Sequence, residues 1–276
     1  MGDTHLSAKA FIKSNLKLAL QTGQLSLHYQ PQFSLAQETL TGIEALLRWR
    51  SKEFGWLNPE LVIAVAEQDE LIVLLSEWVL RQALTDFAQV QNEVKRLSVN
   101  LSVRYLQRRP VVTVVEKYLA ESGVSPHCLD LEITETVVLE SAPALLNALK
   151  QLRQLGISLS MDDFGTGYCG LSYLKKLPLS TVKIDRSFLH DAVSNARDAL
   201  LYHDILQLAR NLDLRIIAEG VENQAQLRFL QLSHCHEAQG YLLAKPMPLS
   251  QLLQFTGQQK TSEFLAVAED IHFLLP

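Results

Sequence analysis

Short runs of alternating hydrophobic and polar residues recur along the chain, separated by longer segments whose apolar residues repeat every three or four positions. The first pattern is typical of half-buried strands and the second of amphipathic helices. The pattern predicts strands at residues 25–31, 41–49, 96–102, 129–135, 158–164, 181–185, 215–220 and 237–244. These eight alternations in one domain predict an α/β fold, a (β/α)8 TIM-like barrel.

The segment 140–156 has clear helix-start and helix-stop signals. Ser141 can cap its start, Pro143 suits the first turn and Gly156 ends it, while leucines form a stripe along one side. Further helices are predicted at residues 60–92, 111–123, 194–212 and 222–232, with a shorter connection at 170–178. No internal repeat or low-complexity linker divides the sequence, which favours one continuous domain.

In each predicted strand, certain polar residues occupy the face that the aliphatic residues leave free. Alternate residues of a strand point to opposite faces, and in a barrel one of those faces is the interior. Leu131 and Ile133, for example, share one face and Glu132 lies on the other. The same parity selects Glu44, Leu46, Arg48, Asn100, Asp162, Lys183, Glu219 and Gln239. Most of these positions lie near the carboxyl ends of their strands, where barrel enzymes keep their active sites.

Composition and charge exclude several other classes of protein. With 47% hydrophobic and 20% charged residues the chain resembles a soluble globular protein, and a net charge of −5 argues against binding DNA or RNA through a basic face. The three cysteines lack CxxC spacing, which argues against a disulfide framework or a zinc cluster. Acidic residues interrupt the apolar stretch 61–80, so no membrane segment is predicted. We expect a cytoplasmic location, either as a standalone protein or as the cytoplasmic domain of a larger one.

Clustered carboxylates inside a barrel take up protons unless cations neutralise them. Oxygen ligands suit a hard divalent ion such as Mg2+ or Mn2+ better than zinc. The candidate ligands are Glu44, Asn100, Glu132, Asp162, Asp163 and Glu219. So many anionic ligands favour two ions, which can share a water and activate it beside a phosphoryl group. Lys183 and Arg48 would then supply fixed positive charge.

Simpler explanations exist for several of these residues. Asp162 and Asp163, taken alone, fit ordinary turn chemistry at a strand end. Lys183 could form an ion pair with Asp185, and Arg48 could stack on the neighbouring Trp49. The metal-site interpretation of the two aspartates is favoured because compatible partners occur in register on the other predicted strands.

Seven motifs in chain order, "EALLRW", "NLS", "EITE", "DDFGTG", "VKID", "AEGVE" and "QGYLLAKP", resemble the EAL-domain phosphodiesterases that hydrolyse bacterial cyclic dimeric GMP. The resemblance extends over residues 16–253. It implies a barrel variant with one antiparallel strand near the start. The expected organisation is a lead-in at residues 1–14, the EAL domain at 15–255, and an amphipathic C-terminal tail at 256–276.

The resemblance also implies roles for individual residues. Glu44, Asn100, Glu132 and Asp162 match the ligands of a first metal, and Asp163 matches a ligand of a second. Glu219 matches a metal-linked residue proposed as general base, Lys183 the lysine that orients the hydrolytic water, and Glu135 the glutamate that positions the "DDFGTG" loop. The implied substrate-binding residues are Arg48, Gln30, Leu46 and Gln239.

Two stretches depart from the family pattern. "YQPQF" has Gln32 where an aliphatic residue is usual, and "GYCGL" has Cys169 and Gly170 where the family commonly has two serines. The second departure lies after the "DDFGTG" motif, in a region that the resemblance links to a homodimer contact. We expect Cys169 and Gly170 to affect the behaviour of that loop.

The sequence therefore predicts metal-dependent hydrolysis of cyclic di-GMP to linear pGpG, which would lower the level of a bacterial second messenger. One alternative is a catalytically silent receptor for the same nucleotide, although such proteins usually lose metal ligands that this chain keeps. A barrel glycosidase with two carboxylates is a more distant alternative. That mechanism does not require Asn100, Lys183 or a doubled aspartate.

Overall fold

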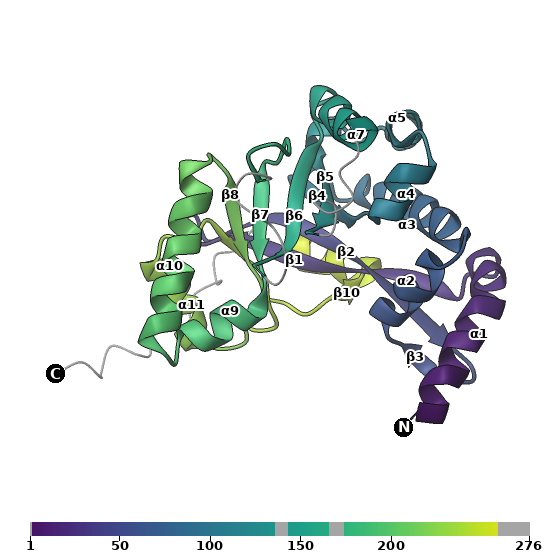
Figure 1. The fold of residues 1–276 in the computed structure, drawn as a ribbon, viewed down its shortest axis with the longest axis horizontal. Coiled ribbons are helices and arrows are strands. Elements are labelled where there is room, and N and C mark those ends of the chain that lie inside the picture. Colours follow the sequence, from purple (N-terminus) through teal and green to yellow (C-terminus); the bar gives the residue numbers. More distant parts are fainter. Residues whose placement is uncertain (1, 136–142, 166–173, 259–276) are drawn as a thin grey trace.

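The computed structural model describes residues 2–135, 143–165 and 174–258, and it confirms the predicted barrel (Figure 1). Within these residues, eight strands pair side by side and close into a ring. They are β1 (Leu25–Ser34), β2 (Thr39–Ser51), β4 (Arg96–Asn100), β5 (Leu129–Thr134), β6 (Ser158–Phe164), β7 (Thr181–Ile184), β8 (Arg215–Ala218) and β9 (Glu237–Ala238). Two short strands, β3 (Gly55–Leu57) and β10 (Met247–Pro248), extend the sheet beside β2 and β1.

Strand β1 is antiparallel to both of its ring neighbours, β2 and β9. The other neighbouring pairs of the ring are parallel, namely β2–β4, β4–β5, β5–β6, β6–β7, β7–β8 and β8–β9. This confirms the expected antiparallel strand near the start. In the β1–β2 register, Gln30 lies opposite Glu44, and Gln32 lies opposite Gly42. The two glutamines are therefore two residues apart on one strand and share its inward face.

Helices surround the barrel on the outside (Figure 1). They are α1 (Gly2–Gln21), α2 (Pro59–Glu67), α3 (Leu71–Phe87), α4 (Val103–Arg108), α5 (Val111–Ser122), the 3-10 turn η1 (Pro126–Cys128), α7 (Pro143–Gln154), α9 (Arg186–Ala192), α10 (Ala196–Asn211), α11 (Gln224–Leu232) and α12 (Leu249–Gln258). Among these described helices, none is both long and apolar enough to cross a membrane. Residues 170–173 of the predicted connection at 170–178 lie outside the described residues.

The helices differ from the predicted pattern in several places, and α4, α9 and α12 lie outside the predicted helices. The expected helix at 60–92 is divided into α2 and α3, because the chain turns at Asp69, whose carboxylate accepts from the backbone N–H of Glu70 at 2.9 Å. Helix α1 was not predicted and runs across the expected boundary between residues 14 and 15. Its buried side chains, among them Ile12 and Leu16, join the core.

The predicted strand at 237–244 is too long, since β9 contains only Glu237 and Ala238. After Gln239 the chain turns, and the carbonyl oxygen of Gly240 accepts from the backbone N–H groups of Leu243 and Ala244 at 3.1 and 3.0 Å. A Cβ on Gly240 would lie 2.2 Å from the backbone nitrogen of Val221, so this close passage requires glycine. Gln239 is thereby fixed at the end of the strand.

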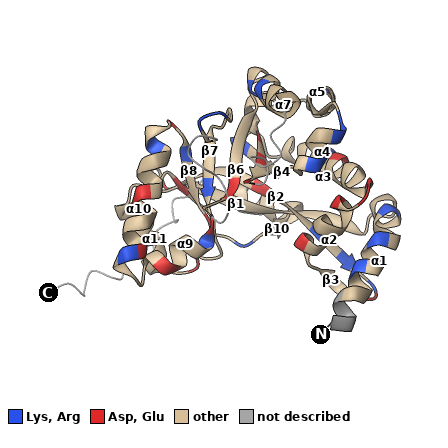
Figure 2. Cartoon of the chain, in the orientation of Figure 1, with Lys and Arg blue, Asp and Glu red and all other residues tan. Residues whose placement is uncertain are grey.

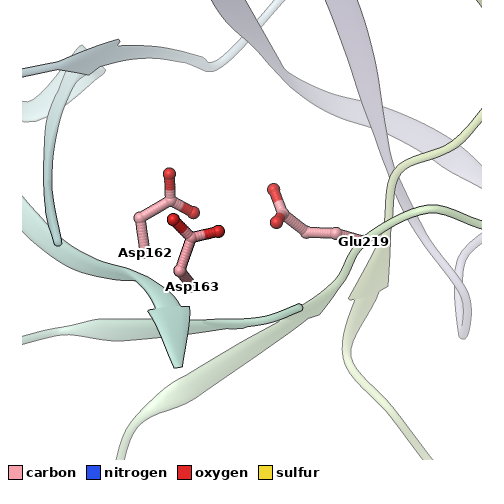
Figure 3. Close-up of side chains that lie close together, drawn as sticks. All are labelled: Asp162, Asp163 and Glu219. Atoms are coloured by element: carbon pink, nitrogen blue, oxygen red, sulfur yellow. The ribbon is translucent and has the colours of Figure 1, made fainter. Parts of the chain in front are cut away.

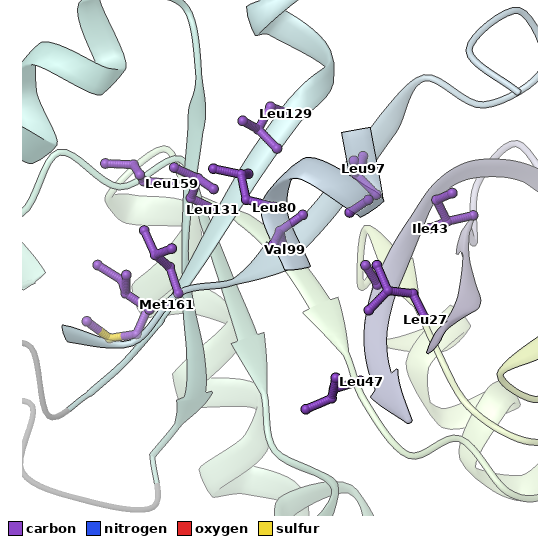
Figure 4. Close-up of a cluster of buried hydrophobic side chains, with 14 of the residues drawn as sticks. Leu27, Ile43, Leu47, Leu80, Leu97, Val99, Leu129, Leu131, Leu159 and Met161 are labelled. Carbon is purple, nitrogen blue, oxygen red and sulfur yellow. The ribbon is translucent and has the colours of Figure 1, made fainter. Parts of the chain in front are cut away.

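The main core lies between the barrel and its helices (Figure 4). Leu129 and Leu131 on β5 and Leu159 on β6 are fully buried, and Leu80 of α3 packs in the same cluster. These are the aliphatic positions whose alternation predicted the outward strand face. The opposite parity therefore points into the barrel, where the polar residues described next are found.

Candidate metal centre

Lys183 on β7 lies at the middle of a group of carboxylates inside the barrel. Its side chain has no exposed surface, and its Nζ lies 2.7 Å from Glu132 Oε2, 2.9 Å from Glu219 Oε1, 3.1 Å from Asp162 Oδ1 and 3.2 Å from Glu44 Oε2. Figure 2 shows acidic positions on the central strands beside a basic position on β7. One lysine therefore contacts carboxylates from four different parts of the barrel wall.

Each of these carboxylates comes from the strand or strand end predicted to carry it. Glu44 is on β2, Glu132 on β5 and Asp162 on β6, and Glu219 directly follows β8. The simpler explanation, in which Lys183 pairs with Asp185, is disfavoured. The Asp185 carboxylate caps α9 by accepting from the backbone N–H of Ser187 at 2.9 Å. Residues that the strand alternation selected, although far apart in the sequence, therefore lie around one lysine.

Asp162 and Asp163 both reach the open side of this group, facing Glu219 (Figure 3). One carboxylate oxygen from each of the three residues lies within 4.8 Å of the others. Adjacent residues in a regular strand point to opposite faces, but here the β6–β7 register shifts between Met161 and Phe164. Asp163 adopts a left-handed backbone with φ 54°, which aspartate tolerates better than most residues.

Asp163 falls inside the predicted strand at 158–164, but the alternation of inward residues did not select it. It lies within β6, at the irregular end of the strand. The bulge allows two consecutive aspartates to serve one site, which ideal strand alternation would not permit.

Amide side chains hold Glu44 in place. Asn100 Nδ2 donates to Glu44 Oε1 at 2.8 Å, and Gln239 Nε2 donates to Glu44 Oε2 at 2.7 Å. Gln239 Nε2 also donates to Gln30 Oε1 at 3.0 Å, and Gln30 Nε2 donates to the carbonyl of Ala244 at 3.1 Å. Asn100 and Gln239 thus donate to the Glu44 carboxylate directly, and Gln30 holds Gln239; all three were predicted from the sequence.

The buried part of the group has strongly perturbed ionisation. Burial opposes charge on Lys183, but the surrounding carboxylates raise its pKa well above the usual range, so it stays protonated. Burial also opposes charge on Glu44, yet Lys183 and the hydrogen bonds from Gln239 and Asn100 lower the pKa of that carboxyl. For Glu132, burial and the neighbouring Glu44 outweigh Lys183 and raise the pKa.

The carboxylates nearer the solvent are also perturbed. Burial, followed by repulsion from Asp162, raises the pKa of Asp163 to about 6. Burial raises the pKa of Glu219 to about 8, although Lys183 acts in the opposite direction. Both groups therefore hold protons over part of the neutral range when no cation is nearby.

These residues fit divalent cations. Among the described residues, Glu132 Oε1 is buried without a hydrogen-bond partner, and Asp162 Oδ1, although 3.1 Å from Lys183 Nζ, makes no hydrogen bond. Fully ionised, the five carboxylates of Glu44, Glu132, Asp162, Asp163 and Glu219 exceed the single charge of Lys183 by four. Two divalent ions would balance that excess, and hard oxygen donors suit Mg2+ or Mn2+.

The remaining predicted residues surround this group less closely. Arg48 Nη1 donates to the carbonyl of Leu47 at 2.8 Å, and Leu46 is half-buried on the same face of β2. Stacking of Arg48 on Trp49 is disfavoured, because successive strand residues face opposite sides and the Trp49 ring packs 5.8 Å from that of Phe11.

Glu135 Oε1 accepts from the backbone N–H of Gly165 at 2.6 Å, which ties the end of β5 to the turn after β6. Cys169, Gly170 and the region expected to form a homodimer contact lie outside the described residues.

Sequence reasoning assigned no role to a second polar group, formed by Gln32, Arg96, Asp130 and Glu237, which is buried inside the barrel. The parity rule would have placed Gln32 and Asp130 on the inward face, two positions from Gln30 and Glu132. Their mutual contacts depend on the closing β1–β9 register, which local patterning does not reveal.

Comparison with known proteins identifies close relatives. The model of the EAL domain family matches residues 13–246. Cyclic di-GMP phosphodiesterase NbdA of Pseudomonas aeruginosa is 40% identical over 247 residues, covering 88% of this chain and 32% of that protein. Cyclic di-GMP phosphodiesterase PdeR of Escherichia coli K12 is 36% identical over 240 residues, covering 86% and 36%.

A solved structure is also similar to this chain. The PaMucR phosphodiesterase in its c-di-GMP complex superposes with a TM-score of 0.82 and 39% identity, over 87% of this chain and 99% of that one. The chain spans about a third of the length of the two curated relatives.

Proposed function

Since the chain belongs to the EAL domain family, we propose that it hydrolyses cyclic di-GMP to linear pGpG in the presence of Mg2+ or Mn2+. The observation that carries this proposal is the group of carboxylates around Lys183, two of whose buried oxygens lack hydrogen bonds within the described part of the chain. NbdA, PdeR and PaMucR are each named as phosphodiesterases, which supports the same reaction here.

The proposed ion-binding residues are Glu44, Asn100, Glu132, Asp162, Asp163 and Glu219. Metal ions bound there would lower the pKa of a water molecule and stabilise charge on the phosphoryl oxygens. Asn100 and Gln239 keep the Glu44 carboxylate in one orientation by donating to its two oxygens. Glu135 keeps the turn at Gly165 close to β5, which fixes the neighbouring aspartates.

In the proposed reaction, a water oxygen bonds to phosphorus and one ester P–O bond of the ring breaks. Glu219 is suited to accept the proton of the attacking water, since its carboxylate is partly exposed and binds protons near neutral pH. Lys183 donates from a fixed, buried position and orients that water. Arg48 steadies the substrate phosphate from the rim of the site, next to Leu46, while Gln30 and Gln239 line the floor.

The main alternative is a receptor that binds cyclic di-GMP without cleaving it. The retained carboxylates argue against this alternative, because nucleotide binding alone needs no group of charges that only cations can neutralise. We place the domain in the cytoplasm, where the proposed substrate acts as a second messenger. A homodimer through the segment after the "DDFGTG" motif stays a prediction.

Incubation of the purified chain with cyclic di-GMP and Mg2+ or Mn2+, followed by chromatographic detection of pGpG, tests the proposal. We expect product from the wild type and from Asp204→Ala, which removes an exposed carboxylate of α10, but not from Asp162→Ala. Intact nucleotide binding without any pGpG would establish the receptor alternative instead.

A further inference from the structure

A chain of hydrogen bonds connects the proposed metal centre with the second polar group in the barrel. Arg96 Nη2 donates to Gln32 Oε1 at 2.9 Å, and Gln32 Nε2 donates to Gln239 Oε1 at 2.9 Å. Gln239 Nε2 in turn donates to Glu44 Oε2 at 2.7 Å. All four side chains are buried, so water does not compete for these contacts.

The direction of every hydrogen bond in this chain follows from its first member. A guanidinium has donors only, so the atom of Gln32 that faces Arg96 must be the amide oxygen. The amide nitrogen of Gln32 then faces Gln239, which must present its own oxygen there. Gln239 is left with its N–H groups directed at Glu44 and Gln30, as observed. Arg96 thus determines which end of two successive amides points toward the metal centre.

Arg96 is itself firmly held. Its Nη2 donates to Glu237 Oε2 in a very short contact, its Nη1 lies 3.3 Å from Glu237 Oε1, and its Nε lies 3.9 Å from Asp130 Oδ2. Asp130 is fixed in addition by Ser160, whose hydroxyl donates at 2.6 Å. These contacts keep the guanidinium in one place.

The backbone leaves room for the pair formed by Gln32 and Arg96. Gly42 lies opposite Gln32 in the β1–β2 register. A Cβ at Gly42 would lie 2.7 Å from Gln32 Oε1 and 3.2 Å from Arg96 Nη2, too close for the present arrangement. The absence of a side chain at Gly42 therefore leaves the space in which Gln32 and Arg96 contact each other.

We propose that Gln32 is a positioning residue that fixes the amide orientation of Gln239, holds an N–H on Glu44, and thereby sets the affinity of the centre for divalent cations. This inference rests on the proposed metal-dependent function. An aliphatic residue at this position could not donate to Gln239. The oxygen of Gln239 would then lack this partner, and rotation of its amide would turn an acceptor toward Glu44.

The test compares Mn2+ dissociation constants of the metal-stripped full chain, measured by titration calorimetry, for three variants. In Gln32→Glu the new carboxylate still accepts from Arg96 but cannot donate to Gln239, whose amide is then driven to rotate. We expect Mn2+ binding at least about ten-fold weaker, equivalent to about 1.4 kcal/mol. Gln32→Met removes both contacts without imposing rotation, and we expect a smaller weakening, about two- to ten-fold.

The control is Gln37→Glu, which adds the same charge at an exposed position in the turn of the same hairpin. Its Mn2+ affinity should stay within about two-fold of the wild type. A second readout is turnover: excess Mn2+ should restore most pGpG formation in Gln32→Met, whereas a merely structural defect would not respond to metal concentration.

The proposal is overturned if Gln32→Glu binds Mn2+ within two-fold of the wild type, or if Gln32→Met is the weaker binder of the two. If Gln32→Glu does not fold, Gln32→Met decides the matter, and unchanged Mn2+ affinity in it overturns the proposal. Because Mn2+ binding needs no substrate, a wild type that binds Mn2+ but forms no pGpG refutes only the proposed function. A wild type without Mn2+ affinity refutes both.

Discussion

Replacing Lys183 by methionine should destabilise the metal-free protein more than any exposed lysine replacement. The substitution keeps the length of the side chain but removes the charge that contacts four carboxylates at 2.7 to 3.2 Å. Loss of one partner from a buried ion pair costs about 3–5 kcal/mol. Because four carboxylates lose their partner here, we expect a decrease near the upper end, about 5 kcal/mol.

That loss corresponds to a melting temperature lower by about 10 °C or more, at about 2–4 °C per kcal/mol for large domains. Thermal unfolding in EDTA, followed by circular dichroism, measures the effect. Lys150→Met, at an exposed position of α7, is the control and should melt within about 2 °C of the wild type.

Saturating Mn2+ should reduce the stability difference between Lys183→Met and the wild type, because divalent cations neutralise the same carboxylates. Turnover of cyclic di-GMP should nevertheless stay at least about a hundred-fold lower, since the water is no longer oriented. If Lys183→Met melted within 2 °C of the wild type in EDTA, the lysine would not be the main neutralising charge, and our description of the centre would be wrong.

Three further predictions concern single residues. Asp162→Asn should lower turnover at least about a hundred-fold, measured as pGpG formed per minute, and retained activity would contradict its assignment as a metal ligand. Burial raises the pKa of Glu219 from its usual 4.5 to about 8, so the folded chain loses stability as the pH rises between these two values. Metal-free Glu219→Gln should therefore gain stability relative to the wild type as the pH rises from about 5 to 8 in thermal melts, and a constant difference would show that Glu219 does not titrate there. Gly42→Ala should lower the free energy of unfolding by about 1–3 kcal/mol, because its Cβ would lie 2.7 Å from Gln32 Oε1. Chemical denaturation measures this change, and an unchanged denaturation midpoint would show that Gln32 and Arg96 move aside without cost.

Alternation of side chains was sufficient to predict the inward residues of the barrel. Glu44, Glu132 and Lys183 sit on regular strands, so a period of two placed them on the correct face without knowledge of the tertiary structure. The same period did not select Asp163, because this residue lies at a bulge, where the alternation fails.

Longer-range features could not be obtained from the pattern. The extent of β9 was overestimated, because the apolar residues after Gln239 pack in a turn rather than in a strand. The contact between Arg96 and Gln32 depends on strand order and register, which the hydrophobic pattern of either segment does not encode. Family motifs suggested the residues of the proposed metal centre but gave no partner for Gln32.

The pairing of β1 with β9 also has a consequence for how the protein folds. Gln30 and Gln239, which meet beside Glu44, are 209 positions apart in the sequence, and Phe33 pairs with Ala238 across the same junction. Contacts of such sequence separation form slowly, because a long loop must close before they are gained. A nascent or truncated chain that ends before Glu237 therefore cannot complete the floor of the site. During refolding, full affinity for Mn2+ should thus appear only when β9 pairs with β1 and closes the ring. The rate at which Mn2+ binding appears would measure the rate of this closure.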